Sequence, residues 1–202
     1  SITPIVMKLV AMKKIGLNHT LDQFYGNSTI SLSAKKITIT HLLTHSSGLK
    51  PFVEYYKSPK LSNNLSSSEY RDLIIKDILS RELDFEPGEK FQYSDLGMIL
   101  LMDIIEKVTG NSLEYLSNNW IYKKLGMENT MFNPSITLLD KIVPTEYDSI
   151  FRKELLHGTV HDENAFLLGG ISGHAGIFSN AEDLGRFGQV MLNKGSWLGN
   201  RY

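Results

Sequence analysis

The sequence predicts a mostly helical domain that contains only short strands. Its clearest element is a helix over residues 95–109, in which apolar residues recur at helical spacing and Gly110 closes the pattern. We expect one short strand, at residues 176–178, within a glycine-rich stretch. The composition, with 42% hydrophobic and 21% charged residues, is that of a globular protein and excludes a disordered or fibrous chain.

Four further segments carry helical patterns. They are residues 4–14, 67–80, 111–124 and 181–193, and a short helical turn is expected at 38–45. Three of these helices start near a side chain that can accept hydrogen bonds from first-turn N–H groups, namely Ser68, Ser112 and Asn180. Gly16 suits the end of the first helix. Residues 27–33 and 51–66 are expected to be polar loops, and 131–142 to be irregular.

Charge and composition exclude several classes of protein. Because 21 Lys and Arg residues accompany 22 Asp and Glu residues, the net charge is −1 and the basic excess of a nucleic-acid binder is absent. No window approaches 18 consecutive apolar residues, so we expect no transmembrane segment in this chain. The lack of cysteine excludes disulfides, thiolate metal sites and a cysteine nucleophile.

The length and the ends of the chain suggest a piece of a longer protein. The 202 residues fit one domain, or one and a half at roughly 150 residues per domain. The chain begins at Ser1 without an initiator Met, directly before an apolar helical pattern, and it stops at Tyr202 without a terminating signal. We therefore expect residues 1–202 to be part of a larger protein.

Five histidines raise the possibility of a zinc site. His41 and His45 are four residues apart, as are His157 and His161, and on a helix each pair would face one side, as zinc ligands need. His174 adds a fifth imidazole. Neither pair carries the glutamate of an H-E-x-x-H protease. We therefore expect structural histidines that donate to backbone carbonyl groups, and no metal.

Paired carboxylates also invite a catalytic interpretation. Asp162 and Glu163, or Glu182 and Asp183, would in principle suit a glycosidase. For the second pair we expect a position in the first turn of a helix, where negative charge meets the helix dipole.

The glycine-rich stretch suggests a phosphate loop only superficially. It contains Gly169, Gly170, Gly173 and Gly176, but their spacing matches neither G-x-G-x-x-G nor a Walker pattern. We expect these glycines to form a tight backbone beside a cleft.

Tyr93 stands out because it lies one residue before the capping position of the strongest helix. The helix N-terminus and any nearby lysine would favour the phenolate and lower the pKa of Tyr93, and such a tyrosine can act as a general acid or base. The alternative is that Tyr93 is a hydrophobic staple.

Five motifs, in order, resemble those of one enzyme family. They are ITITHLLTHSSGL at residues 37–49, FQYSDLG at 91–97, LLMDIIEKVTG at 100–110, LGMENT at 125–130 and GGISGHAGIFSNAEDL at 169–184. Together with their flanking segments, they resemble the serine β-lactamase and penicillin-binding-protein-like hydrolases, nearest to the class C and esterase branch. The resemblance covers roughly residues 4–193.

The resemblance implies a mechanism whose nucleophile lies outside this chain. Members of that family react through the serine of a Ser-x-x-Lys motif, which the lysine and a second-motif Tyr-x-Asn tyrosine deprotonate. Tyr93 matches that tyrosine, whereas Asp95 replaces the usual Asn and can only accept hydrogen bonds, so recognition of an amide substrate is in question. The segment after Ser1 resembles the one that follows Ser-x-x-Lys, so the nucleophile is expected just before Ser1.

Three other matches to the family's motifs lie in the wrong place. Ser-x-x-Lys strings start at Ser33, in a polar loop, and at Ser47, in a helix-ending turn, and neither precedes an apolar helix. The His174-Ala-Gly string mimics the third motif, Lys/His-Thr-Gly, but it precedes the helix that this motif follows in the family. We therefore expect Ser33 and Ser47 not to be nucleophiles, and His174 to be a cleft-lining or structural residue.

The predicted function is that of a serine hydrolase acting through an acyl-enzyme, with Tyr93 and Asp95 as the site residues and no cofactor. Residues 1–202 would form the helical part of an α/β (α+β) β-lactamase/transpeptidase-like domain, with most of the antiparallel sheet missing. Without that sheet, the apolar faces of 4–14 and 95–109 are expected to lose part of their cover. The resemblance suggests a D-Ala peptide, a β-lactam or an ester as substrate, and a periplasmic or cell-envelope location.

Two alternatives stay open at this stage. The chain could belong to a non-catalytic binding or scaffolding domain that keeps the fold, which the presence of Asp95 favours weakly. The histidines could instead serve a zinc hydrolase.

Overall fold

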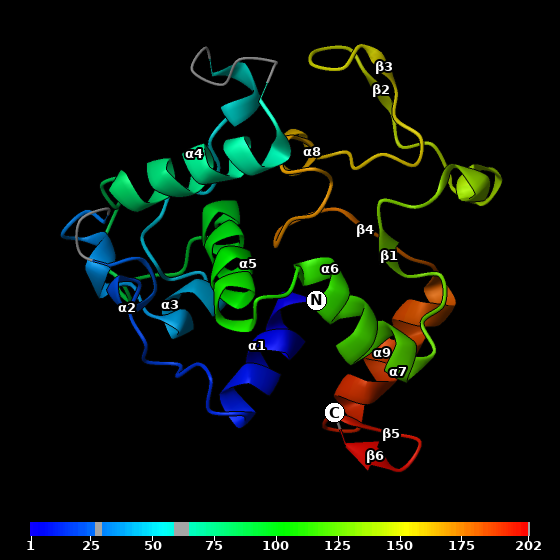
Figure 1. Ribbon diagram of the computed structural model, residues 1–202, viewed down its shortest axis with the longest axis horizontal. Coiled ribbons are helices and arrows are strands. Elements are labelled where there is room, and N and C mark those ends of the chain that lie inside the picture. The colour runs from blue at the N-terminus through cyan, green and yellow to red at the C-terminus, as the bar shows by residue number, and fades with distance from the viewer. Residues whose placement is uncertain (27–29, 59–64, 202) are drawn as a thin grey trace.

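The computed structural model describes residues 1–26, 30–58 and 65–201, so parts of the predicted loops at 27–33 and 51–66 lie outside the described residues. α5 (Asp95–Thr109) lies at the centre of the molecule (Figure 1). Around it pack α1 (Ile2–Ala11), α3 (Ile39–Leu43) and α4 (Ser67–Ser80). The fold is therefore organised around the helix whose periodicity is clearest in the sequence.

Most of the remaining helical elements are short. They are α2 (Asp22–Tyr25), α6 (Leu113–Ser117), α7 (Lys123–Leu125), α8 (Glu163–Leu167) and α9 (Ala181–Leu192), with 3-10 turns at Ala34–Lys36, Tyr55–Lys57 and Ile136–Lys141. A π-helical turn, Asn118–Tyr122, joins α6 to α7. The helix predicted at 111–124 is therefore one helical segment with a change of hydrogen-bond pattern inside it.

The described residues form three small antiparallel sheets of two strands each. β1 (Met131–Phe132) pairs with β4 (Ile177–Phe178), β2 (Tyr147–Asp148) with β3 (Glu154–Leu155), and β5 (Ser196–Trp197) with β6 (Asn200–Arg201). The predicted mostly helical architecture with little sheet is confirmed. Residues 131–142 were predicted to be irregular, but they hold β1 and a 3-10 turn. The sequence does not reveal β1 because a two-residue strand has no periodicity.

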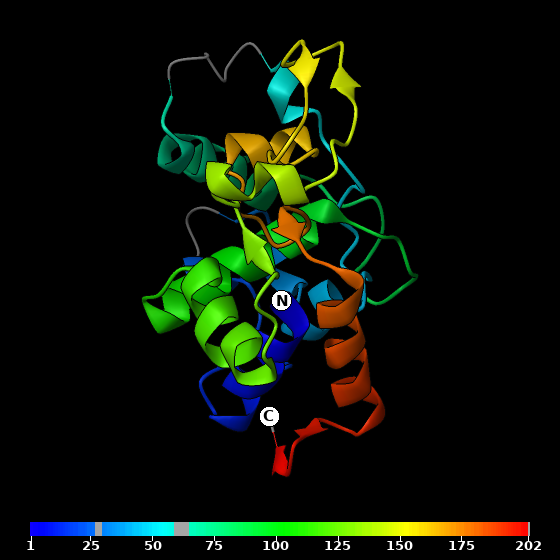
Figure 2. The same cartoon turned by 90° about the vertical axis from the view of Figure 1, so that its right-hand side faces the viewer.

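The two ends of the molecule are built from different elements. In Figures 1 and 2 the β2–β3 hairpin, α4 and α8 occupy one end, and α9 with the β5–β6 hairpin occupies the other.

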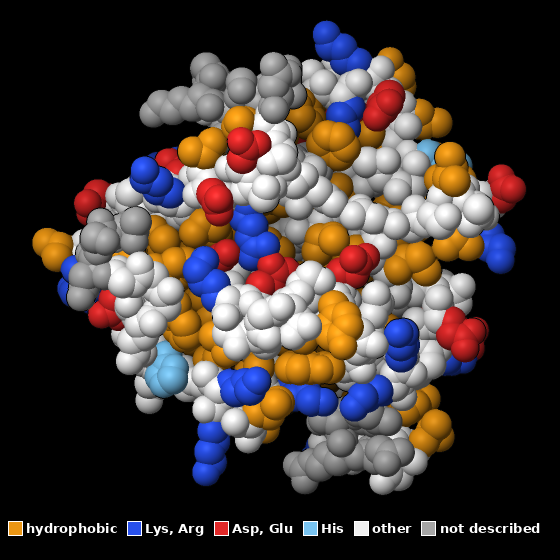
Figure 3. All heavy atoms as spheres, in the orientation of Figure 1, with side chains coloured by type: hydrophobic (Ala, Val, Ile, Leu, Met, Phe, Trp, Pro, Cys, Tyr) orange, Lys and Arg blue, Asp and Glu red, His pale blue; other side chains and the backbone are white. Residues whose placement is uncertain are grey.

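Figure 3 shows acidic and basic side chains intermixed across one face, including the surface over α4 and α5. There Arg71 of α4 pairs with Asp103 of α5 at 2.9 Å and also with Glu106, which fixes the two helices to each other.

Capping side chains set the helix starts. Ser112 and Asn180 cap α6 and α9 as predicted. The cap of α4 is Ser66 and not Ser68, because Ser66 and Glu69 form a reciprocal capping box in which each side chain accepts from the other residue's backbone N–H. The first helix begins earlier than predicted, at Ile2, and ends well before Gly16.

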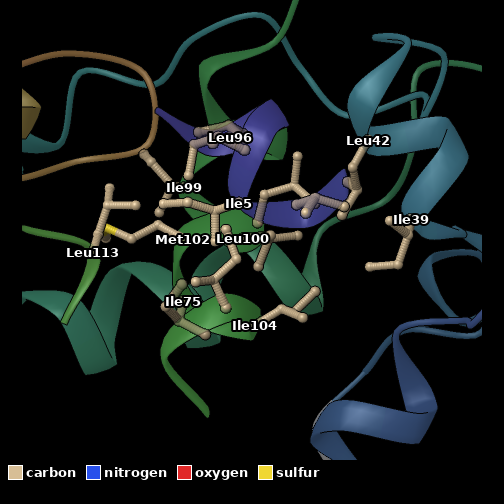
Figure 4. Packing of buried hydrophobic residues seen from close by; sticks show 14 of the residues in the cluster. Ile5, Ile39, Leu42, Ile75, Leu96, Ile99, Leu100, Met102, Ile104 and Leu113 are labelled. Atoms are coloured by element: carbon tan, nitrogen blue, oxygen red, sulfur yellow. The ribbon is translucent and has the colours of Figure 1, made fainter. Parts of the chain in front are cut away.

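The core is one cluster around α5. Figure 4 shows Ile5 of α1, Leu42 of α3 and the α5 side chains Leu96 and Leu100 packed together. All four are fully buried. The expectation that the apolar faces of α1 and α5 lose cover without a sheet is wrong for most of their residues, because these helices pack on each other and on α3, α4 and α6. Met7 and Met12 of the first helical segment are nevertheless 59% and 47% exposed.

Candidate active site

Tyr93 lies where the chain enters α5. Ser94 caps this helix, since its hydroxyl accepts from Gly97 N and donates to Lys50 O at 2.7 Å. The N–H of Asp95 donates to Pro51 O at 2.9 Å. These bonds tie the start of α5 to residues 50–51, and they leave the Tyr93 side chain 51% exposed at the helix N-terminus.

His45 supports the tyrosine ring from one side. The His45 and Tyr93 rings lie 4.5 Å apart, centroid to centroid. His45 Nδ1 accepts a hydrogen bond from Ser94 N at 3.2 Å, and its backbone oxygen accepts from Gln92 N at 2.7 Å. Burial lowers the pKa of His45, although the Asp95 carboxylate opposes this shift. The imidazole is therefore suited to a neutral, hydrogen-bond-accepting role beside Tyr93.

Three segments distant in sequence bring acidic and imidazole groups together beside Tyr93. Asp95, Asp162 and His174 each present a ligand-type atom, and these atoms lie within 4.8 Å of one another. Asp162 is the N-cap of α8, and its Oδ1 accepts from Ala165 N at 2.7 Å. His174 Nε2 lies 2.9 Å from the same Oδ1. Sequence reasoning treated Asp162 only as one of several carboxylates and placed neither it nor His174 next to Tyr93.

A metal ion could in principle use these three groups, since carboxylate oxygens and imidazole nitrogens are common ligands. Among the described residues this is the one such grouping of three or more metal-ligating side chains. The same contacts form an ordinary hydrogen bond between an imidazole and a carboxylate.

The pKa of Tyr93 is raised, not lowered as the sequence suggested. Burial is the main cause, followed by the hydrogen bond to Asp95 and the negative charges of Asp95 and Asp162. Asp95 takes part in none of the ion pairs formed by the described residues, and Asp162 is hydrogen-bonded to the His174 imidazole. In this chain the nearest charges therefore oppose the phenolate, because they are carboxylates and not the lysine that the prediction assumed.

The other histidines do not form zinc sites within the described part of the chain. His157 Nε2 lies 2.9 Å from Leu139 O and 2.7 Å from Ile142 O, which confirms the expected structural contact with backbone carbonyl groups. His161 instead contacts the Glu146 carboxylate at 2.7 Å, and both side chains are exposed. His41 Nδ1 accepts from Thr38 N in a capping box.

The two Ser-x-x-Lys serines lie in unsuitable surroundings. Ser47 is 2% exposed, and its hydroxyl accepts from Leu49 N. Ser33 lies near Ser31 and Glu82. Lys36, the lysine of the first string, pairs with Glu86 instead of activating Ser33.

The glycine-rich loop is a tight backbone beside the site, as predicted. A Cβ placed on Gly173 would meet Met98 O of α5 at 2.0 Å, and one on Gly176 would meet Gly170 O at 2.3 Å. The approach of Gly173 to Met98 O seats the loop against α5, the helix that carries Asp95, and His174 lies within 4.8 Å of Asp95. An open pocket of about 840 Å³ has Asp162 on its wall, between residues 129–145 and 175–180.

The second carboxylate pair has a structural role. Glu182 and Asp183 lie in the first turn of α9, as predicted. Asp183 is buried, and it accepts from Asn129 N and Thr130 Oγ1, each at 2.8 Å. These bonds hold the LGMENT segment against α9.

The chain is similar in sequence to proteins that are named as hydrolases. It is 38% identical over 175 residues to an N-acetylmuramyl-L-alanine amidase of Bacillus subtilis, covering 80% of this chain and 39% of the relative. It is 35% identical over 184 residues to a putative D-alanyl-D-alanine carboxypeptidase of Escherichia coli, covering 85% and 42%. The chain thus spans about two fifths of the length of these relatives.

Solved structures show the same fold. A class C beta-lactamase from Rhodobacter sphaeroides matches with a TM-score of 0.71 at 17% identity, over 96% of this chain and 49% of that one. An octameric penicillin-binding protein homologue from Pyrococcus abyssi matches with a TM-score of 0.66 at 25% identity, over 95% and 42%. These matches fit the helical part of a larger α+β domain.

The family model described as Beta-lactamase matches residues 3–201, nearly the whole chain. The match extends through α5, with Tyr93 at its start, and through the glycine-rich loop that carries His174. The chain therefore belongs to the beta-lactamase family.

Proposed function

We propose that this chain is the helical part of a serine hydrolase that acts through an acyl-enzyme. Residues 1–202 form a partial domain in this proposal, and the chain alone is inactive because it lacks the nucleophile. The observation that carries the proposal is the position of Tyr93, half exposed at the N-terminus of α5 and two residues before Asp95, where the family has its second motif.

The position of α1 supports a nucleophile just before Ser1. A Cβ on Gly173 would lie 3.4 Å from Ile2 Cδ1, so the first turn of α1 lies against the loop that carries His174. A serine that precedes α1 would therefore lie on the side of the molecule that holds Tyr93. Ser33, by contrast, lies beside the Glu82 carboxylate, but Lys36 of its string pairs with Glu86. Ser47 is buried and accepts from Leu49 N.

In the proposed mechanism the serine oxygen attacks the substrate carbonyl, and Tyr93 shares in removing the serine proton. With Asp95 and Asp162 as its charged neighbours, Tyr93 is protonated at neutral pH. It becomes a base only when a cation lies beside it, and the lysine of the Ser-x-x-Lys motif is proposed to supply that charge. The protonated phenol then returns its proton to the leaving group.

The proposed substrate is an amide or ester of the cell-wall peptide type. The relatives are named for cleaving N-acetylmuramyl-L-alanine and D-alanyl-D-alanine bonds. β-Lactams and small esters are further candidates, because the same acyl-transfer chemistry acts on them. The names of the relatives also support a cell-envelope location. Among the described helices, none is long and apolar enough to cross a membrane.

A second candidate function is a non-catalytic binding domain with the same fold. The observation that favours it is Asp95, whose carboxylate lies beside a second carboxylate and cannot donate to a substrate carbonyl. In that case the peptide ligand would bind without being cleaved.

The test incubates the full-length protein with an N-acetylmuramyl peptide, a D-Ala-D-Ala peptide, a β-lactam and an activated ester. We expect turnover of at least one and a mass increase on a serine N-terminal to residue 1. Residues 1–202 alone should hydrolyse none of them above buffer. Substrate binding without turnover or adduct would instead establish the binding domain, and activity of the 202-residue chain that is lost on Ser33→Ala or Ser47→Ala would refute the assignment of the nucleophile.

A further inference from the structure

We propose that Asp162 is a second carboxylate of the active site, and that His174 and Ser172 are positioning residues that hold it beside Tyr93. This inference rests on the proposed function. It assigns a role to three residues that no motif assigned: an N-cap aspartate, a buried imidazole and a buried hydroxyl. Both side-chain contacts, Ser172 to His174 and His174 to Asp162, have hydrogen-bond length.

The imidazole of His174 is held on both of its nitrogens. Nδ1 lies 2.8 Å from Ser172 Oγ, and Nε2 lies 2.9 Å from Asp162 Oδ1. Because the Asp162 carboxylate can only accept, Nε2 carries the proton and donates it to Asp162. Nδ1 is then the acceptor for the Ser172 hydroxyl. One tautomer therefore satisfies all three groups.

Burial makes this arrangement rigid. The His174 side chain is 2% exposed and Ser172 is 3% exposed, so water does not compete for either hydrogen bond. The loop that carries both residues is seated on α5 through the close approach of Gly173 to Met98 O. Helix α5 also carries Asp95, so His174 holds Asp162 at a fixed position relative to the Tyr93–Asp95 end of α5.

Asp162 is itself held as a carboxylate that faces the site. Burial would raise its pKa, but hydrogen bonds from the His174 side chain and from the backbone N–H groups of Ala165 and Asn164 outweigh this and lower it. The Asp162 carboxylate lies within 4.8 Å of the Asp95 carboxylate, two residues after Tyr93, and its charge opposes ionisation of Tyr93. Asp162 and Asp95 together thus set the charge that Tyr93 experiences.

The chemical consequence is that Tyr93 keeps its proton until a positive group enters the site. Two carboxylates favour the phenol over the phenolate, and a cation bound between them and the ring reverses that preference. Displacing Asp162 would leave Tyr93 with one carboxylate neighbour. Its pKa should then fall, because less negative charge opposes the phenolate.

The experiment uses the full-length protein and two variants at His174. His174→Phe keeps a ring of similar size but removes both hydrogen bonds, whereas His174→Gln keeps an N–H donor that can reach Asp162. The first readout is the titration of Tyr93, followed by 13C NMR of labelled tyrosine and assigned with Tyr93→Phe. The second is kcat and KM on whichever substrate the protein turns over.

We expect His174→Phe to lower the pKa of Tyr93 and to reduce kcat by about 100-fold with little change in KM, the scale of loss caused by small misplacements in active sites. His174→Gln should keep the pKa of Tyr93 and kcat close to those of the unaltered protein. Asp162→Asn should also lower the pKa of Tyr93. The matched control is His161→Phe, which breaks an exposed imidazole–carboxylate contact with Glu146 and should change neither readout.

If His174→Phe does not fold, as judged by its urea unfolding curve, Asp162→Asn and Ser172→Ala carry the same test. A Tyr93 titration that is unchanged in Asp162→Asn would overturn the inference. A stoichiometric divalent metal that is lost on His174→Phe would also overturn it, because His174 would then be a ligand. If the protein has no hydrolase activity, the Tyr93 titration alone decides the inference, so the two failures are distinguishable.

Discussion

At the residue scale, Tyr93 illustrates how a motif position and its charge environment are separate properties. Its place before α5 follows from the local sequence, since Ser94 caps the helix. Its charge environment does not, because Asp162 reaches it from the start of a different helix. The same phenol would ionise more readily beside a lysine, whereas beside two carboxylates it keeps its proton.

Tyr93→Phe should lower kcat of the full-length enzyme and leave its stability nearly unchanged. The hydroxyl is half exposed and little volume is lost, whereas general acid–base groups contribute about 10²- to 10⁴-fold to the rate. That loss corresponds to roughly 3–5 kcal/mol of barrier. Burst kinetics with an activated ester would locate it in acylation.

The matched control is Tyr115→Phe, because Tyr115 is 52% exposed and Tyr93 51%. It should leave both kcat and the unfolding midpoint unchanged. An unaltered kcat/KM in Tyr93→Phe would remove Tyr93 from the mechanism.

At the element scale, the glycine-rich loop and the β2–β3 hairpin are each fixed by a few polar or steric contacts. The loop approaches α5 so closely that Gly173 has no room for a side chain. The hairpin is closed by Asp148, which accepts from the backbone N–H groups of Ile150, Phe151 and Arg152. Both contacts can be tested by single substitutions.

Gly173→Ala should destabilise the chain by about 1–3 kcal/mol, the usual cost of overpacking. Its Cβ would meet a backbone oxygen, Met98 O, at 2.0 Å, and neither partner can rotate away. Gly185→Ala on α9 is the control, because a Cβ there meets nothing within 4 Å. It should stabilise the helix by roughly 0.5–1 kcal/mol. Urea unfolding of both variants measures the difference, and equal effects would contradict the proposed seating of the loop.

Asp148→Asn should destabilise the hairpin at neutral pH but not at low pH. Hydrogen bonds from Phe151 N and from the Arg152 side chain hold the pKa of Asp148 well below its ordinary value, although burial opposes them. Since the folded pKa is depressed, the stabilisation is fully present above the unfolded pKa of about 3.9 and is lost as pH falls through the folded value.

The difference in unfolding free energy between the parent chain and Asp148→Asn should therefore be constant near pH 7 and shrink below about pH 4. Hydrogen exchange of the Phe151 and Arg152 amides would show whether the loss is local to the hairpin. Asp72→Asn, at an exposed position on α4, should change stability by less than about 0.5 kcal/mol at any pH. A pH-independent difference for Asp148→Asn would contradict the assignment.

At the scale of the whole molecule, α9 carries a run of exposed apolar side chains along one side. Leu184, Met191 and Leu192 are 58%, 55% and 78% exposed and share one side of the helix, being seven and eight residues apart. The opposite side of α9 buries Val190. We therefore expect this side of α9 to contribute to any self-association of residues 1–202.

The double variant Leu184→Lys, Leu192→Lys should reduce self-association and dye binding by the isolated chain, because it places charge on the exposed apolar side of α9. Sedimentation velocity and ANS fluorescence measure the two effects. Leu32→Lys is the control, since Leu32 is 82% exposed but lies in a loop away from α9, and it should change neither. An unaltered chain that is already monomeric and binds no dye would contradict the prediction.

The sequence by itself determined the long helices, most of their caps and the family. Helical periodicity and capping depend on residues within a few positions of each other, so α5 and its Gly110 end could be predicted to the residue. Of the short strands, only β4 was predicted, as the strand at 176–178. The others escaped prediction because a two-residue strand has no periodicity, and its partner can lie far along the chain, as β4 does from β1.

Only the tertiary structure decided which groups surround Tyr93. His174 and Asp162 come from a glycine-rich loop and from the start of α8, and their meeting with Asp95 depends on the contact of Gly173 with α5. The charge at a site is a sum over neighbours in space, and spacing along the sequence does not contain it. For that reason the sequence could single out the tyrosine as a candidate residue, whereas the structure reversed the predicted direction of its pKa shift.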